Sequence, residues 1–189
     1  MNKKLFDLQL PGWLAGWRQQ MPSDDASDAQ RMAWLISLAG DNIRHEGGPF
    51  AAGLFDQQGV CVSVGVNLVV PAGCSVLHAE MVALMLAQQT LGRYDLSDGG
   101  RHQHTLFSTT EPCAMCLGAL PWSGISGLVC AARDEDARAA GFDEGDKPEP
   151  WWVGLERRGI KVVRDLCRDQ ARAVLDEYAA GGGELYNAD

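Results

Sequence analysis

The chain has 189 residues, of which 46% are hydrophobic and 22% are charged. That length suits one globular domain that can bury a full core without disulfide bonds. The formal net charge of −9 disfavours a nucleic-acid partner, because a phosphate backbone is bound by clustered Lys and Arg and the sequence has no such run.

The N-terminal segment, residues 1–27, forms an extension ahead of the first predicted core helix. Asp7, Gln9 and Pro11 interrupt its apolar residues, so it lacks the continuous apolar stretch of a signal peptide. No stretch of the chain is long and apolar enough to cross a membrane. We therefore expect a cytoplasmic, reducing location, in which cysteines at short spacing indicate a metal or catalytic site rather than disulfide bonds.

The rest of the chain alternates between predicted helices and strands. An amphipathic helix follows the polar loop 22–28 and ends near His45, and a β-hairpin follows it. The predicted strands are residues 50–55, 60–66, 104–108, 127–132 and 161–163, and the later helices are residues 77–91, a segment after 111, 134–140 and 165–180. Pro112 is expected in the first turn of its helix, where the missing N–H has no cost. The pattern predicts a single domain over residues 1–189 with an α/β fold, a three-layer α/β/α sandwich around a mixed sheet of about five strands, and a tail over residues 181–189.

Four residues in two short motifs indicate a metal site. His78 and Glu80 are two positions apart, and Cys113 and Cys116 are one helical turn apart and follow a proline. A catalytic zinc ion needs three protein ligands and a fourth position that is open to water. We therefore expect His78, Cys113 and Cys116 to bind one zinc ion and Glu80 to transfer protons. Each motif opens a helix, and a helix N-terminus favours the thiolate form that binds metal.

A closed structural zinc site is the alternative, with His102, His104 or another cysteine as the fourth ligand. The sequence has no second C-x-x-C and no pair of histidines at the spacing of a zinc finger, so the open site is favoured. The other four cysteines have no neighbour at ligand spacing and are interpreted as packed thiols: Cys61, Cys74, Cys130 and Cys167.

With these residues the chain resembles the cytidine deaminase superfamily, and within it the bacterial guanine deaminases, from about residue 47 to residue 144. The motifs are residues 47–50 (Gly-Gly-Pro-Phe), 66–67 (Val-Asn), 78–80 (His-Ala-Glu), 111–116 (Glu-Pro-Cys-Ala-Met-Cys) and 141–144 (Gly-Phe-Asp-Glu). The zinc motifs are shared across the superfamily, whereas the last motif and Trp122 are narrower and favour guanine. The resemblance implies a five-stranded sheet between helices, one zinc ion per chain, a homodimer, and hydrolysis of guanine to xanthine and ammonia.

The resemblance also implies a set of substrate-binding residues. Asn67 is similar to the residue that hydrogen-bonds the purine, and Phe50 and Trp122 are similar to walls of the base pocket. Ala79 lies between the zinc ligand and the proton carrier and belongs to the same set. From the residues alone, Asn67 is equally well interpreted as a turn residue that ends the hairpin. Trp122 is better interpreted as a core residue, and Phe50 is similarly ambiguous.

Two further roles come from the resemblance. Glu144 lies where guanine deaminases have a second catalytic acid that contacts the substrate, although aspartate is the more familiar residue there. Its acidic neighbours alone favour a solvated loop, and the resemblance reverses that preference. In the family the C-terminal segment crosses to the partner subunit and covers the pocket with an aromatic ring, a role that Tyr186 is expected to fill.

Three alternatives stay open. A tRNA adenosine deaminase shares the motifs, but it would need a basic groove to hold RNA. A deaminase of an aminotriazine, cytosine or a nucleoside would use the same zinc chemistry. A zinc-stabilised interaction module without turnover would use Trp151 and Trp152 as a contact patch. The favoured partner is a small purine base, with neither nucleic acid nor a membrane expected.

Overall fold

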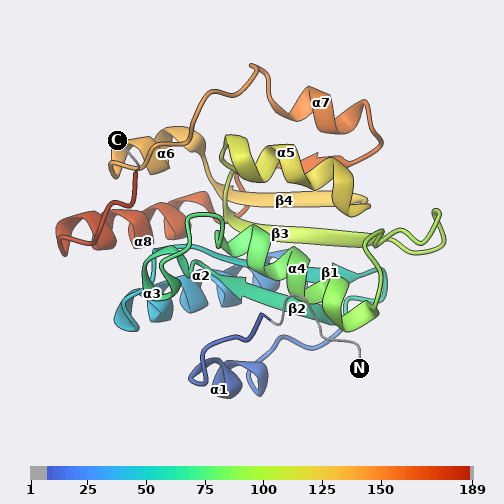
Figure 1. Ribbon diagram of the computed structural model, residues 1–189, viewed down its shortest axis with the longest axis horizontal. Coiled ribbons are helices and arrows are strands. Elements are labelled where there is room, and N and C mark those ends of the chain that lie inside the picture. The colour runs from blue at the N-terminus through green and yellow to red at the C-terminus, as the bar shows by residue number, and fades with distance from the viewer. Residues whose placement is uncertain (1–7, 188–189) are drawn as a thin grey trace.

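The computed structural model describes residues 8–187 and has a five-stranded sheet at its centre, with strand order β2-β1-β3-β4-β5. The strands are β1 (Ala51–Asp56), β2 (Cys61–Val66), β3 (His104–Thr110), β4 (Gly127–Ala132) and β5 (Lys161–Val163). β1 pairs antiparallel with β2 and with β3, whereas β4 pairs parallel with β3 and with β5. The predicted mixed sheet of five strands is confirmed (Figure 1).

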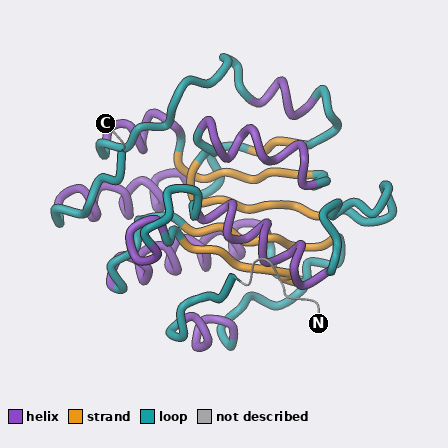
Figure 2. Tube along the Cα trace, in the orientation of Figure 1, coloured by secondary structure: helices purple, strands orange, loops and turns teal. Residues whose placement is uncertain are grey.

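Helices cover both faces of this sheet, as Figures 1 and 2 show. One face is covered by α4 (Ala79–Leu91), α5 (Ala114–Ser123) and α7 (Trp152–Glu156), and the other by α2 (Asp28–Arg44) and α8 (Arg168–Ala180). Two short helices lie in connections, α3 (Val69–Ala72) and α6 (Asp134–Ala139), and α1 (Leu14–Arg18) lies in the N-terminal extension ahead of α2. Within residues 8–187, no helix has the length and apolar character to span a membrane.

The core forms on both faces because successive strand residues point to opposite sides. Leu106 and Leu128 contact the cluster beneath α4 and α5, whereas Phe107 and Val129 contact the cluster beneath α2 and α8. The central strands are therefore buried along most of their length, and β4 (Gly127–Ala132) is wholly apolar, as is typical of a sheet that is covered on both faces.

Local side-chain hydrogen bonds fix the starts of two predicted elements. Ser27 and Gln30 form a capping box, in which each side chain accepts a hydrogen bond from the other residue's backbone N–H, and α2 begins after it. Oδ1 of Asp56 accepts hydrogen bonds from the backbone N–H groups of Gln58 and Val60 and so closes the β1–β2 turn.

Two predicted helix starts are wrong. α5 begins at Ala114 with Cys113 as its N-cap, and Cys113 is still extended at ψ 171°. Pro112 therefore precedes the cap and does not lie in the first turn. α8 begins at Arg168 rather than at residue 165, because Asp165 has φ +67°, which lies outside the right-handed helical region.

The described part of the N-terminal extension packs on α2. Leu14 is 2% exposed and joins the core on this face. The Trp13 ring stacks on the His45 ring with centroids 4.3 Å apart, and Nε1 of Trp17 donates to the Asp41 carboxylate. Residues 1–7 of the predicted extension lie outside the described residues.

Candidate active site

The predicted site lies where α4 and α5 begin. These helices follow β2 and β3, and both strands run antiparallel to β1, so the two helix N-termini meet at the same edge of the sheet. His78 is the N-cap of α4 and Cys113 is the N-cap of α5. The partial positive charge of two helix N-termini at one point stabilises thiolates and carboxylates there.

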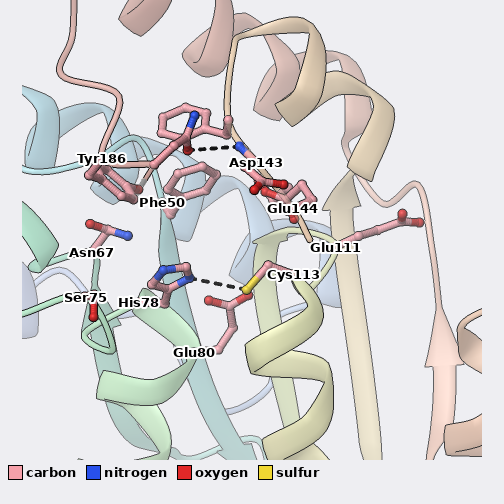
Figure 3. A pocket seen from close by; sticks show the side chains of 13 residues that line it. Phe50, Asn67, Ser75, His78, Glu80, Glu111, Cys113, Asp143, Glu144 and Tyr186 are labelled. Carbon is pink, nitrogen blue, oxygen red and sulfur yellow. Dashed lines mark hydrogen bonds between the residues drawn. The ribbon is translucent and has the colours of Figure 1, made fainter. Parts of the chain in front are cut away.

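His78, Cys113 and Cys116 form a group of three metal-binding donors whose ligand atoms all lie within 4.8 Å of one another. Nδ1 of His78 lies 3.5 Å from Sγ of Cys113 (Figure 3). One imidazole and two thiols fit a tetrahedral zinc ion with one open position. His104 begins β3 and the site follows the end of β3, so His102 and His104 are at the opposite edge of the sheet and cannot close the site.

The two thiols of this group differ in acidity. A hydrogen bond from Cys116 lowers the pKa of Cys113 to about 4, and contact with His78 adds to this effect against the opposing effect of burial. The same hydrogen bond, together with burial, raises the pKa of Cys116. The protein alone therefore prepares one thiolate, and metal binding would displace the second proton. This donor chemistry fits zinc.

Glu80 lies beside the metal-binding group, in the first turn of α4, and is 6% exposed. Burial and the charge of the Cys113 thiolate raise the pKa of its carboxyl. Glu80 lines the cavity next to the group without being one of the three donors. A buried carboxyl with a raised pKa can take a proton and return it, as a general acid/base must.

A cavity of about 210 Å³ opens beside these residues. Figure 3 shows side chains from several elements pointing into it. The predicted site residues in its lining are Phe50, Asn67, His78, Glu80, Cys113, Glu144 and Tyr186. The sequence did not single out the others for this role: Ser75, Thr110, Glu111, Phe142, Asp143 and Asn187.

Polar atoms in the cavity wall are buried without a hydrogen-bond partner in the described protein. They are Nδ2 of Asn67, Oγ1 of Thr110, Oε2 of Glu144 and the hydroxyl of Tyr186. The other end of the Asn67 amide is used, since Oδ1 accepts a hydrogen bond of 3.2 Å from the Val69 N–H. Buried polar groups are normally paired, so these atoms form a binding surface for a small polar ligand.

Glu144 faces this cavity and is 6% exposed. Burial raises the pKa of its carboxyl to about 8, and the positive charge of Lys147 offsets only part of this rise. Nζ of Lys147 lies 3.9 Å from Oε2 of Glu144, while it donates to the Pro112 carbonyl at 2.9 Å and pairs with Asp134. A carboxyl that titrates near neutral pH is suited to proton transfer.

The C-terminal tail covers the cavity of its own chain. The Tyr186 ring lies 5.4 Å from the Phe142 ring, measured between centroids. Oδ1 of Asn187 accepts a hydrogen bond from the Asp143 N–H, and Nδ2 of Asn187 donates to the Gly141 carbonyl. In this structure Tyr186 and Asn187 therefore line the cavity of their own chain, whereas the resemblance predicts Tyr186 over the cavity of a partner subunit. Residues 188 and 189 lie outside the described residues.

Two predicted substrate-binding residues do not line the cavity. Trp122 is 80% exposed near the end of α5, whose first turn carries the thiols, so its side chain cannot reach the pocket of its own chain. Ala79 is fully buried, and its side chain belongs to the core beneath α4. The spacing of residues along the chain does not show which way either side chain points.

The sequence reasoning missed Asn42, a residue in the last turn of α2. Its Nδ2 donates to the carbonyl groups of Gly48 and Asn67. A signal was present, because Asn42 falls on the same helix face as Leu35 and Ala39, where the amphipathic pattern requires an apolar residue.

Comparison with known proteins agrees with this geometry. Residues 25–132 match the family model described as the cytidine and deoxycytidylate deaminase zinc-binding region. The structure of guanine deaminase from Nitrosomonas europaea is 45% identical, with a TM-score of 0.87, over 95% of this chain and 98% of that one. A crystal structure in complex with 2,6-diaminopurine is 46% identical, with a TM-score of 0.88, over 99% of this chain and 98% of that one.

A second guanine deaminase matches a shorter stretch of the chain. The guanine deaminase of Bacillus subtilis (strain 168) is 37% identical over 108 residues, which are 54% of this chain and 65% of that enzyme. The family match covers more than half of the chain and includes all three metal-binding residues. The chain therefore belongs to the cytidine and deoxycytidylate deaminase family of zinc-dependent enzymes.

Proposed function

We propose that this protein hydrolyses guanine to xanthine and ammonia. The observation that carries the proposal is the small cavity in which Asn67 and Glu144 present buried, unpaired polar atoms next to Glu80 and the metal-binding group. Two solved structures support it, since one is of a guanine deaminase and the other contains bound 2,6-diaminopurine.

The size of the cavity favours a free base as the substrate over a larger molecule. Its volume of about 210 Å³ is below the range of roughly 300–1,000 Å³ typical of drug-sized ligands. The aromatic walls, Phe50 and Phe142, meet edge to face at 4.9 Å between centroids and offer apolar surface to a planar ring. The net charge of −9 disfavours the alternative of a tRNA substrate, which is bound through its phosphates.

Two carboxyl groups of this chain, those of Glu80 and Glu144, carry out the proton transfers. When bound, zinc supplies the Lewis acid that makes a water molecule nucleophilic near neutral pH. Glu80 takes a proton from that water while the oxygen adds to the ring carbon that bears the exocyclic amine. Glu80 then delivers this proton to the neighbouring ring nitrogen, which gives a tetrahedral carbon in the substrate.

Release of ammonia needs a second proton, and Glu144 is placed to donate it. Burial raises the pKa of its carboxyl, to about 8 in the metal-free protein, and so favours the protonated form that can donate. It protonates the departing amine, the carbon–nitrogen bond breaks, and the new hydroxyl returns a proton to Glu144 as the carbonyl forms. Asn67 orients the base through Nδ2, and Tyr186 covers the cavity and excludes bulk water.

A homodimer is part of the proposal. Trp122 and Met115 are exposed by 80% and 36% on the outer face of α5, and Tyr94 is 82% exposed. An apolar surface of this kind suits a second copy of the chain. If Trp122 forms a wall of a base pocket as predicted, the pocket must be that of the partner. The substitution Trp122→Asp is expected to shift the sedimentation coefficient to that of a monomer, and an unchanged dimer would contradict the proposal.

A reducing, cytoplasmic location also belongs to the proposal. Cys113 and Cys116 must remain reduced in order to bind metal as thiolates, and all six cysteines are free in the structure. Reducing compartments keep paired thiols in that state.

An ammonia-release assay on the zinc-loaded protein tests the activity. We expect turnover of guanine, and little or none of cytosine or of adenosine in a tRNA anticodon loop. The matched control is Glu80→Gln, which keeps the size of the side chain and removes the proton carrier. Preference for cytosine or RNA would replace the substrate assignment, and the absence of ammonia from every substrate would favour the interaction module.

A further inference from the structure

Asn42 is a buried amide that supports the cavity from behind. It is 1% exposed, on the core-facing side of α2, and it does not line the cavity. We propose that Asn42 is a positioning residue that holds Asn67 in the orientation required to bind the substrate base. This inference rests on the proposed function, because it assigns the support of a residue in that same pocket.

The two hydrogen bonds of Asn42 join segments that both border the cavity. Nδ2 donates to the Gly48 carbonyl at 2.8 Å and to the Asn67 carbonyl at 2.9 Å. The Asn67 N–H also donates to the Phe50 carbonyl at 3.0 Å, and Oδ1 of Asn67 accepts from the Val69 N–H. Asn67 is thereby fixed at its carbonyl, its N–H and one side of its amide, which leaves Nδ2 for the ligand.

The backbone around Asn42 is packed too closely to reorganise easily. A Cβ atom at position 47 would lie 2.3 Å from Nδ2 of Asn42, and one at position 48 would lie 2.9 Å from Oδ1 of Asn67. Gly47 and Gly48 therefore allow the chain to pass between the two amides. The position of Asn67 depends on this contact.

Asparagine suits this position for a chemical reason. Its NH₂ group carries two donors on a short side chain, so it can satisfy two carbonyl groups at once. A serine hydroxyl has one proton to donate and is shorter, and an alanine has none. Loss of the amide would leave two carbonyl groups without this partner and would allow the Asn67 backbone to shift.

The first test measures guanine kinetics for Asn42→Ala and for the milder Asn42→Ser. We expect KM to rise about three- to tenfold, the range that corresponds to the loss of one ordinary hydrogen bond, with kcat changed less and zinc content unchanged. The matched control is Ser123→Ala, which removes a buried 2.7 Å hydrogen bond to the Leu120 carbonyl at the far end of α5. A rise in KM that is equal in the control would overturn the inference, because it would reflect general destabilisation.

A double-mutant cycle separates positioning from structural support. In an Asn67→Ala background, the Asn42 substitutions should raise KM by less than twofold, since the residue through which Asn42 acts is gone. Additive effects would overturn the inference. If the unmodified protein does not deaminate guanine, the proposed function fails by itself, and the same cycle is then run on the heterocycle that releases ammonia.

Discussion

Replacing Glu144 with glutamine is expected to stabilise the fold while it removes catalysis. The carboxyl is 6% exposed, and burial raises its pKa from the ordinary value of 4.5 to about 8. The unfolded chain releases this proton above pH 4.5, whereas the folded chain retains it up to about pH 8. Between these values the folded state binds more protons than the unfolded state, so its stability falls as the pH rises.

The size of the effect follows from the pKa shift. The loss is about 1.4 kcal/mol per pH unit above 4.5, which gives about 3 kcal/mol at pH 7. Lys147 does not remove this cost, because its Nζ lies 3.9 Å from the carboxylate and is held by Asp134 and the Pro112 carbonyl. Glutamine has no charge to bury, so Glu144→Gln should gain up to this amount at pH 7 and nothing below about pH 4.5.

Urea unfolding followed by circular dichroism at pH 4, 5.5 and 7 measures the effect in metal-free protein. The matched control is Asp146→Asn, an exposed acid in the same loop, for which no gain is expected. In zinc-loaded protein the gain should be smaller, because the positive ion favours the ionised carboxylate. An equal gain at pH 4 and pH 7 would refute the reasoning, and so would a loss of stability at pH 7. The guanine turnover of the same variant should fall about 10²–10⁴-fold.

The remaining predictions concern the metal, the proton carrier and the close contact of the tail. Glu80→Gln should lower kcat about 10²–10⁴-fold with zinc content unchanged by elemental analysis, and full activity would contradict its role. Gly48→Ala should raise KM for guanine more than it lowers the melting temperature, because the new Cβ would lie 2.7 Å from the Tyr186 hydroxyl and 2.9 Å from Oδ1 of Asn67. Removal of zinc with a chelator should abolish ammonia release and lower the melting temperature, and both should recover when zinc is restored. Recovery with magnesium instead would argue against the thiolate site.

The two motifs of the metal site were predictable because each is local. The helical turn between Cys113 and Cys116 and the two-residue spacing of His78 and Glu80 fix positions within each motif. The fold then brings the two motifs together across 35 positions of the chain. The strand and helix pattern then predicted the mixed sheet, since hydrophobic periodicity reports which residues are buried. The structure agrees on both points.

Residues whose roles depend on distant segments were beyond the sequence pattern. Asn42 contacts Asn67 across 25 positions of the chain. A polar residue on an apolar helix face indicates that it has a buried hydrogen-bond partner, but it does not identify that partner. The resemblance predicts Trp122 in the pocket, but the helix that places Cys113 at the cavity turns Trp122 outward.

The sequence by itself predicted the fold class, the candidate ligand set and the candidate proton carrier, because each prediction uses residue type and short-range spacing. The tertiary structure decided which side chains line the cavity, including Phe142 and the tail residue Tyr186 over its own chain's cavity. It also decided the acidity of Glu144, since a pKa near 8 comes from burial by segments far apart in the chain. Periodicity identifies a buried face, whereas only the folded chain identifies what that face contacts.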